Sequence, residues 1–161
     1  MKCRERLESY LRQQQVGFDV QQHLTAFTAQ EIAETEHIPG KQVAKTVVAW
    51  ADGELILLVL PASLHVDLAR LTAALGAKAI RLAHESEFVD TFPDCEVGAM
   101  PPFGNLYDLP VYVDRSLTNN EIVVFPAGTH TESMSVRFAD YARLVEPTIV
   151  EFARPNITSV P

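Results

Sequence analysis

The stretch Val43-Ala-Lys-Thr-Val-Val-Ala-Trp50 is followed, after Ala51-Asp-Gly53, by Glu54-Leu-Ile-Leu-Leu-Val-Leu60, and this pair of segments decides the fold. Both segments are rich in aliphatic and β-branched residues, which is typical of strands. The Asp-Gly pair between them predicts a tight turn. The second segment is apolar at consecutive positions rather than at alternate ones. It is therefore expected to be a central strand that is covered on both faces.

Further elements are expected on both sides of this pair. Upstream, the sequence predicts an amphipathic helix over residues 3–15, a strand over 18–22 and a helix over 28–36 whose capping box is Thr28-Ala-Gln-Glu31. Downstream, helical spacing predicts a leucine-rich helix that ends at Gly76. Its apolar residues are Leu64, Leu68, Leu71 and Leu75. The other expected elements are strands over 78–82, 111–113, 121–125 and 133–136, and helices over 85–92 and 137–145.

The order of these elements indicates the fold class. Helices and strands are mixed without regular βαβ alternation, which favours an α+β domain over a doubly wound one. At 161 residues, of which 47% are hydrophobic, the chain is long enough for one domain with a real core. We expect this domain to cover residues 1–150. A C-terminal tail, 151–161, is expected to fray from Arg154.

Composition also limits the partners. The longest apolar run, Leu55–Leu60, is too short for a membrane span, and the first residues lack the apolar segment of a signal peptide. We therefore expect a cytoplasmic protein without a membrane partner. The formal net charge is −8, whereas proteins that grip nucleic acid through its phosphates usually have a basic surface. Any nucleic-acid substrate should be contacted over a small portion, or with another protein supplying affinity.

Cysteine and histidine spacing argues against a metal. Cys3 and Cys95 show no metal-type spacing, and no two histidines stand four residues apart. The sequence therefore predicts no metal centre and no cofactor. The two cysteines are interpreted as those of a protein in a reducing cytoplasm. Cys95 is expected to be a buried structural cysteine, because no cationic residue stands near it in the sequence.

Lys45 is the most unusual polar residue of the first strand. Alternation places it on the same face as Val43, Val47 and Ala49. Lysine is seldom fully buried without a partner, so Lys45 either extends to solvent at a sheet edge or lines a cavity. In a cavity, desolvation would lower the pKa of its ammonium group and a bound anion would raise that pKa. In both cases Lys45 offers a donor for a phosphate or a developing oxyanion.

A second candidate is the segment Gly98-Ala-Met-Pro-Pro-Phe-Gly104. Its two prolines fix φ and supply no backbone donor, so the segment cannot continue a helix or a central strand. Its glycines permit backbone angles and close approaches that a Cβ would block. The result is a stiff loop. It is either a structural turn or a preformed binding loop carried by the scaffold.

Two more positions leave alternatives open. His130 follows a strand and a run of turn formers in Gly128-Thr-His130, and could be a general base, a donor to substrate or a surface turn residue. Asp114 ends a predicted strand and either projects into a site or caps a turn. Ser133 and Ser135 lie near His130, but no G-x-S-x-G nucleophile elbow is present. A serine nucleophile is therefore not expected.

The order of these features resembles the YbaK/prolyl-tRNA synthetase-associated domain family. The resemblance rests on Lys45-Thr46, a buried strand that ends in Leu60-Pro61, the helix end Leu75-Gly76-Ala77 and the G-x-x-x-P-x-G loop, in that order. It covers nearly the whole chain, to about Pro147. Members are free-standing aminoacyl-tRNA deacylases and the editing insertion of bacterial prolyl-tRNA synthetases. The resemblance implies a mixed, mostly antiparallel and partly barrel-like β-sheet flanked by helices.

The resemblance also implies an activity and a site. The family hydrolyses the ester between a wrong amino acid and the terminal adenosine of tRNA, often the tRNA for proline. Lys45 matches the family's essential lysine, near the terminal phosphate and the ester. The loop amides face the ester carbonyl, and we expect those of Gly98 and Ala99 to bind the oxyanion, because the prolines donate nothing. The other substrate-binding residues expected are Thr46, Met100, Pro101, Pro102, Phe103, Gly104, Gly128, Thr129 and His130.

Several details stay open at this level. Met100 and Phe103 are candidates for a wall that sets pocket volume and so excludes the correct amino acid. Many cysteine-specific members have a serine where this chain has Pro101, so the amino acid removed is not defined. No side chain stands out as a general base, and the substrate's 2′-hydroxyl or amine could position the water. The expected partners are the aminoacyl-tRNA acceptor end and an aminoacyl-tRNA synthetase, with the oligomeric state open.

Two alternative functions compete with editing. A non-catalytic module that binds an aminoacyl or nucleotide ligand should show a damaged lysine or loop, and Lys45 and Gly98–Gly104 are intact. A general small-ester hydrolase would need a nucleophile–base pair, which the sequence does not offer. An aminoacyl-tRNA editing hydrolase is therefore the leading hypothesis.

Overall fold

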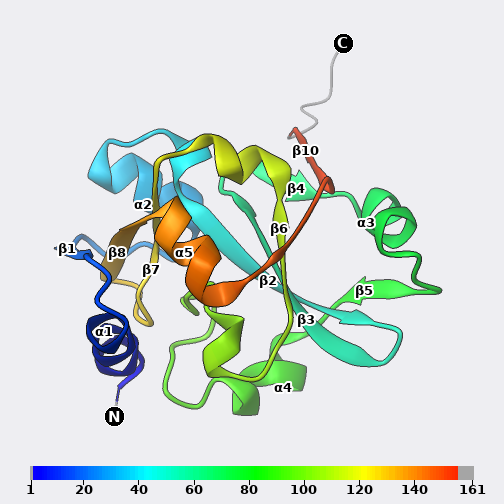
Figure 1. Ribbon diagram of the computed structural model, residues 1–161, viewed down its shortest axis with the longest axis horizontal. Helices are drawn as coiled ribbons and strands as arrows, with labels where there is room; N and C mark the ends of the chain where they lie inside the picture. The colour runs from blue at the N-terminus through cyan, green and yellow to red at the C-terminus, as the bar shows by residue number, and fades with distance from the viewer. Residues whose placement is uncertain (1, 156–161) are drawn as a thin grey trace.

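The strand pair at the centre of the sequence forms the middle of a five-stranded sheet in the computed structural model, which describes residues 2–155 (Figure 1). β2 (Ala44–Ala51) and β3 (Glu54–Pro61) are antiparallel and are joined by Asp52 and Gly53, both at positive φ, as tight hairpin turns require. β3 pairs on both sides, and Ile56–Leu60 are at most 3% exposed. The central, doubly covered strand is confirmed.

The sheet order is β5-β2-β3-β6-β9, with parallel pairing of β6 to β3 and to β9. A second, antiparallel sheet has the order β1-β8-β7, and a single parallel bridge between Val43 and Val124 connects the two sheets. A third, two-stranded sheet pairs β10 with β4. The remaining strands are β1 (Asp19–Gln22), β4 (Leu64–Val66), β5 (Ile80–Leu82), β6 (Val111–Asp114), β7 (Ile122–Pro126), β8 (Glu132–Arg137), β9 (Thr148–Val150) and β10 (Ala153–Pro155).

Helices cover these sheets, which makes the domain α+β as predicted. α2 begins after Thr28, whose side chain accepts a hydrogen bond from the Glu31 amide, so the predicted cap is confirmed. None of the helices within residues 2–155 is long and apolar enough to cross a membrane. The α-helices are α1 (Cys3–Gln13), α2 (Ala29–Glu36), α3 (Leu68–Leu75), α4 (Glu85–Phe88) and α5 (Phe138–Val145).

The main core lies where β2, β3 and β6 face β7 and β8. Ala44 and Val48 of β2 belong to it, and so do Met100 and Phe103 of the proline-rich loop. On the other face of β2 and β3, a separate cluster packs against Leu71 of α3 and against Phe152. A third, smaller cluster lies under α2 and includes Val43. The proline-rich loop is thus part of the main core and not an appendage.

The structure corrects several sequence expectations. Leu64 lies in β4, because Asp67 caps α3 by accepting from the Arg70 amide and the helix starts only after it. The helix expected over 85–92 is α-helical only to Phe88, and a 3-10 turn, Val89–Thr91, follows it. β9 and β10 were not predicted. The fold continues past residue 150, because Phe152 is fully buried and β10, which contains Arg154, pairs with β4.

Candidate functional site

Lys45 lies near the start of β2, opposite Leu60 of β3. It shares the face of Val47 and Ala49, as alternation predicted, and both of these pack in the cluster under α3. The Lys45 side chain is partly buried, so it is neither free in solvent nor sealed in the core. Burial lowers the pKa of its ammonium group, because removing water disfavours the charged form. A bound anion would raise that pKa again.

Thr46, the next residue, carries an unusual hydroxyl. Its Oγ1 is buried and has no hydrogen-bond partner among residues 2–155. Buried polar atoms are nearly always paired, and an unpaired one costs free energy. A ligand or a water would complete the hydrogen bonding of this atom, and the substrate contact expected of Thr46 stays a prediction.

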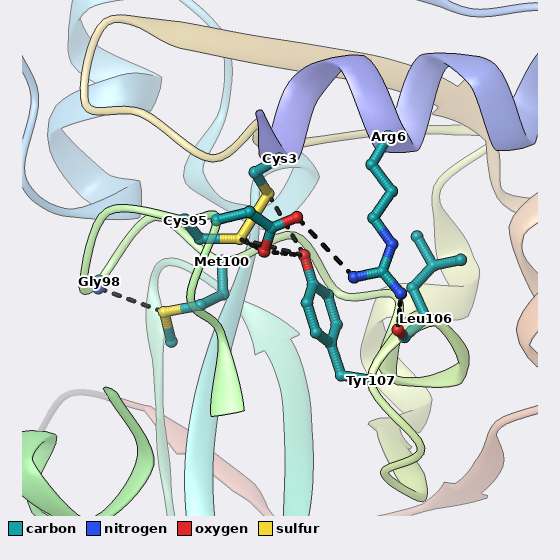
Figure 2. Close-up of a disulfide and its surroundings, with 8 residues drawn as sticks. Cys3, Arg6, Cys95, Gly98, Met100, Leu106 and Tyr107 are labelled. Atoms are coloured by element: carbon teal, nitrogen blue, oxygen red, sulfur yellow. Dashed lines mark hydrogen bonds and ion pairs between the residues drawn. A yellow bond between two sulfur atoms is a disulfide. The ribbon is translucent and has the colours of Figure 1, made fainter. Parts of the chain in front are cut away.

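The first half of the proline-rich loop is at the surface. Gly98 is exposed, has φ of +87° and donates its amide to Met100 Sδ at 3.3 Å, as Figure 2 shows. Thioether sulfur is a weak acceptor, so this amide is open to a stronger one. The Ala99 amide donates to the Glu96 carbonyl at 3.0 Å. It is therefore engaged in this conformation, so that of the two amides expected to bind the oxyanion only that of Gly98 has no oxygen acceptor.

The second half of the loop is core. Pro101, Pro102, Phe103 and Gly104 are buried, and Phe103 is fully so. The Phe103 ring packs edge-on against Tyr141 at 5.2 Å, and the Tyr141 hydroxyl donates to the Pro102 carbonyl at 2.7 Å. A Cβ on Gly104 would lie 2.5 Å from the Leu109 carbonyl oxygen, so only glycine fits there. These four residues support the loop from the inside.

Gly128-Thr-His130 lies beside the loop. The Gly128 amide donates to the Ala99 carbonyl at 2.9 Å, and the Gly128 carbonyl accepts from the Glu96 amide at 2.8 Å. His130 places its Cε1 3.6 Å from where a Cβ on Gly98 would stand, and its Nε2 3.6 Å from a Glu96 carboxylate oxygen. Thr129 points elsewhere, since its hydroxyl donates to Glu132 at 3.1 Å. The structure thus brings Gly98 and His130 together.

One β-bridge connects the start of the Lys45 strand to the strand that precedes Gly128. The parallel bridge joins Val43 to Val124, and both chains then run in the same direction. Lys45 follows its bridge residue by two positions along β2, as Pro126 does along β7. The chain continues from Pro126 directly into Gly128. The bridge therefore relates the start of β2 to the segment that leads into Gly128, while Lys45 itself lies on the β2 face of Val47 and Ala49, opposite the main core that contains the proline-rich loop.

A disulfide between Cys3 and Cys95 anchors this region, a bond that the sequence interpretation of the two cysteines did not anticipate. Their Cα atoms are 5.2 Å apart, within the normal range for a disulfide, although the residues are separated by 92 positions. The Cys3 amide also donates to the Asp94 carbonyl at 3.1 Å. Gly128 packs directly on the bond, because a Cβ there would lie 2.5 Å from Cys3 Cβ.

Polar groups surround the disulfide (Figure 2). The Tyr107 hydroxyl donates to Asp94 at 3.1 Å, and the guanidinium of Arg6 lies 3.8 Å from the same carboxylate. Burial, together with the Asp94 charge, raises the pKa of Tyr107. Asp94 and the two cysteines are close enough to share a metal ion, but the disulfide occupies both sulfurs. Arg6 also shows that a cationic residue reaches this region from α1, which the local sequence did not reveal.

Comparison with known proteins identifies the family. The family model described as an aminoacyl-tRNA editing domain matches residues 23–144, which is most of the chain. The chain belongs to the aminoacyl-tRNA editing domain family. The family expected from the sequence is thereby confirmed. The matched range of the editing domain holds Lys45, Gly98–Gly104 and Gly128–His130, but not Cys3.

Named relatives match the editing domain to different extents. The multifunctional Ser/Thr-tRNA deacylase ProXp-y of Escherichia coli (strain K12) is 30% identical over 155 residues, which cover 93% of this chain and 92% of the relative. A proline–tRNA ligase of Lactococcus lactis subsp. cremoris (strain SK11) is 30% identical over 120 residues, 73% of this chain but only 18% of the ligase. The domain thus matches one protein almost end to end and a small part of another.

Solved structures share the fold. A crystal structure described as a candidate trans-editing enzyme for prolyl tRNA synthetase has a TM-score of 0.83 at 20% identity, covering 96% of this chain and 98% of that one. A protein described only as hypothetical has a TM-score of 0.83 at 17% identity, with 92% and 99% covered. At these identities the likeness shows the fold alone.

Asp114 of the editing domain is a structural cap and not a site residue. Its carboxylate accepts from the Ser116 amide at 3.0 Å and from the amides of Phe152 and Ala153, both at 2.8 Å. Burial alone would raise its pKa, but the hydrogen bonds from Ser116, Phe152 and Ala153 outweigh burial and hold the pKa below its ordinary value. Of the two alternatives left open for Asp114, the turn cap holds.

One site neighbour escaped the sequence reasoning. Phe27 is 63% exposed, and its ring lies 4.9 Å from the His130 ring, centroid to centroid. The available signal was the capping box at Thr28, which places Phe27 immediately before α2. A groove of about 750 Å³ between β1, α2 and β7 is lined in part by His23 and Leu24, but by none of the predicted site residues.

Proposed function

We propose that the protein removes a wrong amino acid from tRNA in trans, with the scissile ester seated at Gly98 beside His130. Membership of the editing family and the near full-length match to a named deacylase make the protein an aminoacyl-tRNA deacylase, an enzyme that hydrolyses the aminoacyl-tRNA ester. The finer proposals concern which groups act on the ester, and which amino acid and tRNA are served.

The observation that carries the proposed site is the Gly98 amide. Gly98 is an exposed residue at a backbone angle that favours glycine, and its amide donates only to a thioether. When water attacks the ester carbonyl, negative charge develops on the carbonyl oxygen. An amide already aimed at that oxygen stabilises the charge without reorganising. The oxyanion would replace Met100 Sδ as the acceptor of Gly98, exchanging a weak hydrogen bond for a strong one.

Lys45 and Thr46 are assigned to the nucleotide. The partly buried ammonium of Lys45 offers a charge to the terminal phosphate, which would raise the lysine pKa again. The unpaired Thr46 hydroxyl would gain a partner in the same complex. Because the net charge is −8, we expect affinity to come from a few such contacts at the acceptor end rather than from a basic surface.

Two groups can orient the attacking water. The substrate's own 2′-hydroxyl or amine lies next to the ester in any aminoacyl-tRNA. His130, whose Nε2 lies 3.6 Å from a Glu96 carboxylate oxygen and whose ring is close to Gly98, can hold a water at the edge of the same space. An ester is a labile bond, so its hydrolysis does not require a side-chain nucleophile.

Substrate identity is proposed from the relatives. The relative that matches almost end to end is a Ser/Thr-tRNA deacylase, so seryl and threonyl esters are the first candidates, followed by alanyl and cysteinyl esters. Matches to part of proline–tRNA ligases support the tRNA for proline as carrier and a synthetase as partner. A pocket that admits a small wrong residue and excludes the correct one would act as the second sieve of editing.

The deciding experiment measures deacylation of tRNA mischarged with serine, threonine, alanine or cysteine. We expect the wild type to hydrolyse at least one species and Lys45→Ala to lose most of that activity. Lys41→Ala is the matched control, because it removes the same charge from an exposed lysine four residues away. No turnover of any species would contradict editing, and tight binding without turnover would favour the non-catalytic module. Full activity in Lys45→Ala would refute the site but not the function.

A further inference from the structure

Phe27 is an aromatic residue in an exposed position that its local structure does not explain. It directly precedes the helix cap Thr28, and an apolar residue there commonly packs against the fourth helical residue. That fourth residue, Ile32, is only 2% exposed, whereas Phe27 is 63% exposed. Most of the Phe27 side chain therefore lies outside the packing that this position usually provides.

The Phe27 ring is turned toward the proposed ester site. It lies 4.9 Å from the His130 ring at an interplanar angle of 53°, and His130 in turn stands 3.6 Å from the Cβ position of Gly98. Phe27 is thus one side chain further from the ester position than His130. Most of its ring remains accessible to another molecule.

The backbone beneath Phe27 is fixed. The Ala26 amide donates to the His130 carbonyl at 2.8 Å, and the His23 amide donates to the Thr131 carbonyl at 2.9 Å. On the other side, the Phe27 amide is held by a Glu31 carboxylate oxygen at 3.3 Å. An aromatic ring that is exposed yet held on both sides of the chain loses little conformational freedom on binding.

We propose that Phe27, with the His130 ring beside it, is the surface on which the terminal adenine of the tRNA stacks. This inference rests on the proposed function. The adenine and the scissile ester are attached to the same ribose, so a base must lie within one nucleoside of Gly98. Aromatic side chains bind bases through their π-faces. Stacking also supplies affinity without positive charge, as a protein with a net charge of −8 requires.

Deacylation kinetics test this role. Phe27→Ala should raise KM by roughly 5- to 150-fold, the range expected for the loss of one stacked base, with kcat nearly unchanged. Phe27→Tyr should retain the wild-type KM. Leu24→Ala is the matched control, because Leu24 is a 79% exposed apolar residue three positions away. An unchanged KM in Phe27→Ala, or an equal rise in Leu24→Ala, would overturn the proposal.

A binding measurement separates this inference from the function. The chain has one tryptophan, Trp50, so Phe27→Trp adds a single new reporter. Uncharged acceptor-stem RNA that ends in CCA should quench the added fluorescence, whereas the same RNA ending in CC should not. Wild type gives the Trp50 baseline, and Leu24→Trp should not distinguish the two RNAs. Equal quenching of Phe27→Trp by both RNAs would refute stacking, even if deacylation is confirmed.

Discussion

The two halves of the loop Gly98–Gly104 differ in almost every physical respect. Gly98 is exposed and its amide has only a thioether acceptor, whereas Phe103 is fully buried between Phe125 and Tyr141. The exposed half offers a backbone donor, and the buried half packs in the main core and so fixes the position of that donor. The difference shows that seven residues can hold both a backbone donor and the side chains that position it. Substitutions in the buried half should therefore lower stability, and substitutions in the exposed half should lower the rate.

The buried half predicts the largest effect. Phe103→Ala should lower the free energy of unfolding by about 3–5 kcal/mol, because it empties a fully enclosed aromatic position. Urea unfolding measures this loss. At a temperature where the variant is still folded, activity should fall much less than stability. A loss of activity without a loss of stability would show that Phe103 contacts substrate after all.

The disulfide predicts the next effect, because it holds the exposed half from outside. Cys95→Ser should cost about 2–4 kcal/mol of unfolding free energy, since it releases a bond between residues 92 positions apart. It should also lower kcat, because Glu96 and Gly128 connect the disulfide to Ala99. Denaturant unfolding with and without reductant provides the measurement.

The controls for the disulfide follow from its pairing. Cys3→Ser and the double variant should resemble Cys95→Ser, because all three remove the same bond and their effects are not additive. Wild type in reductant should behave like the variants. Equal wild-type stability with and without reductant would contradict a structural role for the bond.

The exposed half predicts a third effect, on rate more than on stability. Gly98→Ala leaves room for the methyl group, whose nearest contact is an ordinary 3.6 Å to His130, but φ of +87° is strained for alanine. We expect about 1 kcal/mol of destabilisation and a roughly 10- to 100-fold lower kcat/KM, because the Gly98 amide would no longer point at the oxyanion.

Gly53 offers a matched control for Gly98. It has φ of +88°, also has space for a methyl group, and lies in the β2–β3 turn. Gly53→Ala should therefore lose similar stability and keep the wild-type rate. If both variants keep the wild-type rate, the Gly98 amide does not take part in the reaction.

The comparison also shows what sequence alone could predict. The β2–β3 pair, the Thr28 cap and the face of Lys45 follow from local patterns, and the structure confirms them. The disulfide and the burial of Phe152 depend on contacts across the fold, which no local pattern encodes. The sequence located the loop but not the division within it, because burial of Phe103 is decided by Tyr141 and Phe125 from distant segments.

Met100 stands between the two halves and predicts the smallest effect. Its side chain is 4% exposed, so it belongs to the core, yet its sulfur accepts from the Gly98 amide. Met100→Leu keeps nearly the same volume and removes only the acceptor. Stability should change by less than about 1.5 kcal/mol. Because the amide then has no competitor for the oxyanion, kcat should stay within about threefold of wild type or rise. Deacylation and urea unfolding of the same preparation measure both. A tenfold fall in kcat with unchanged stability would mean that the Met100 sulfur orients the Gly98 amide for the reaction. Met100 would then contribute to both the core and the chemistry.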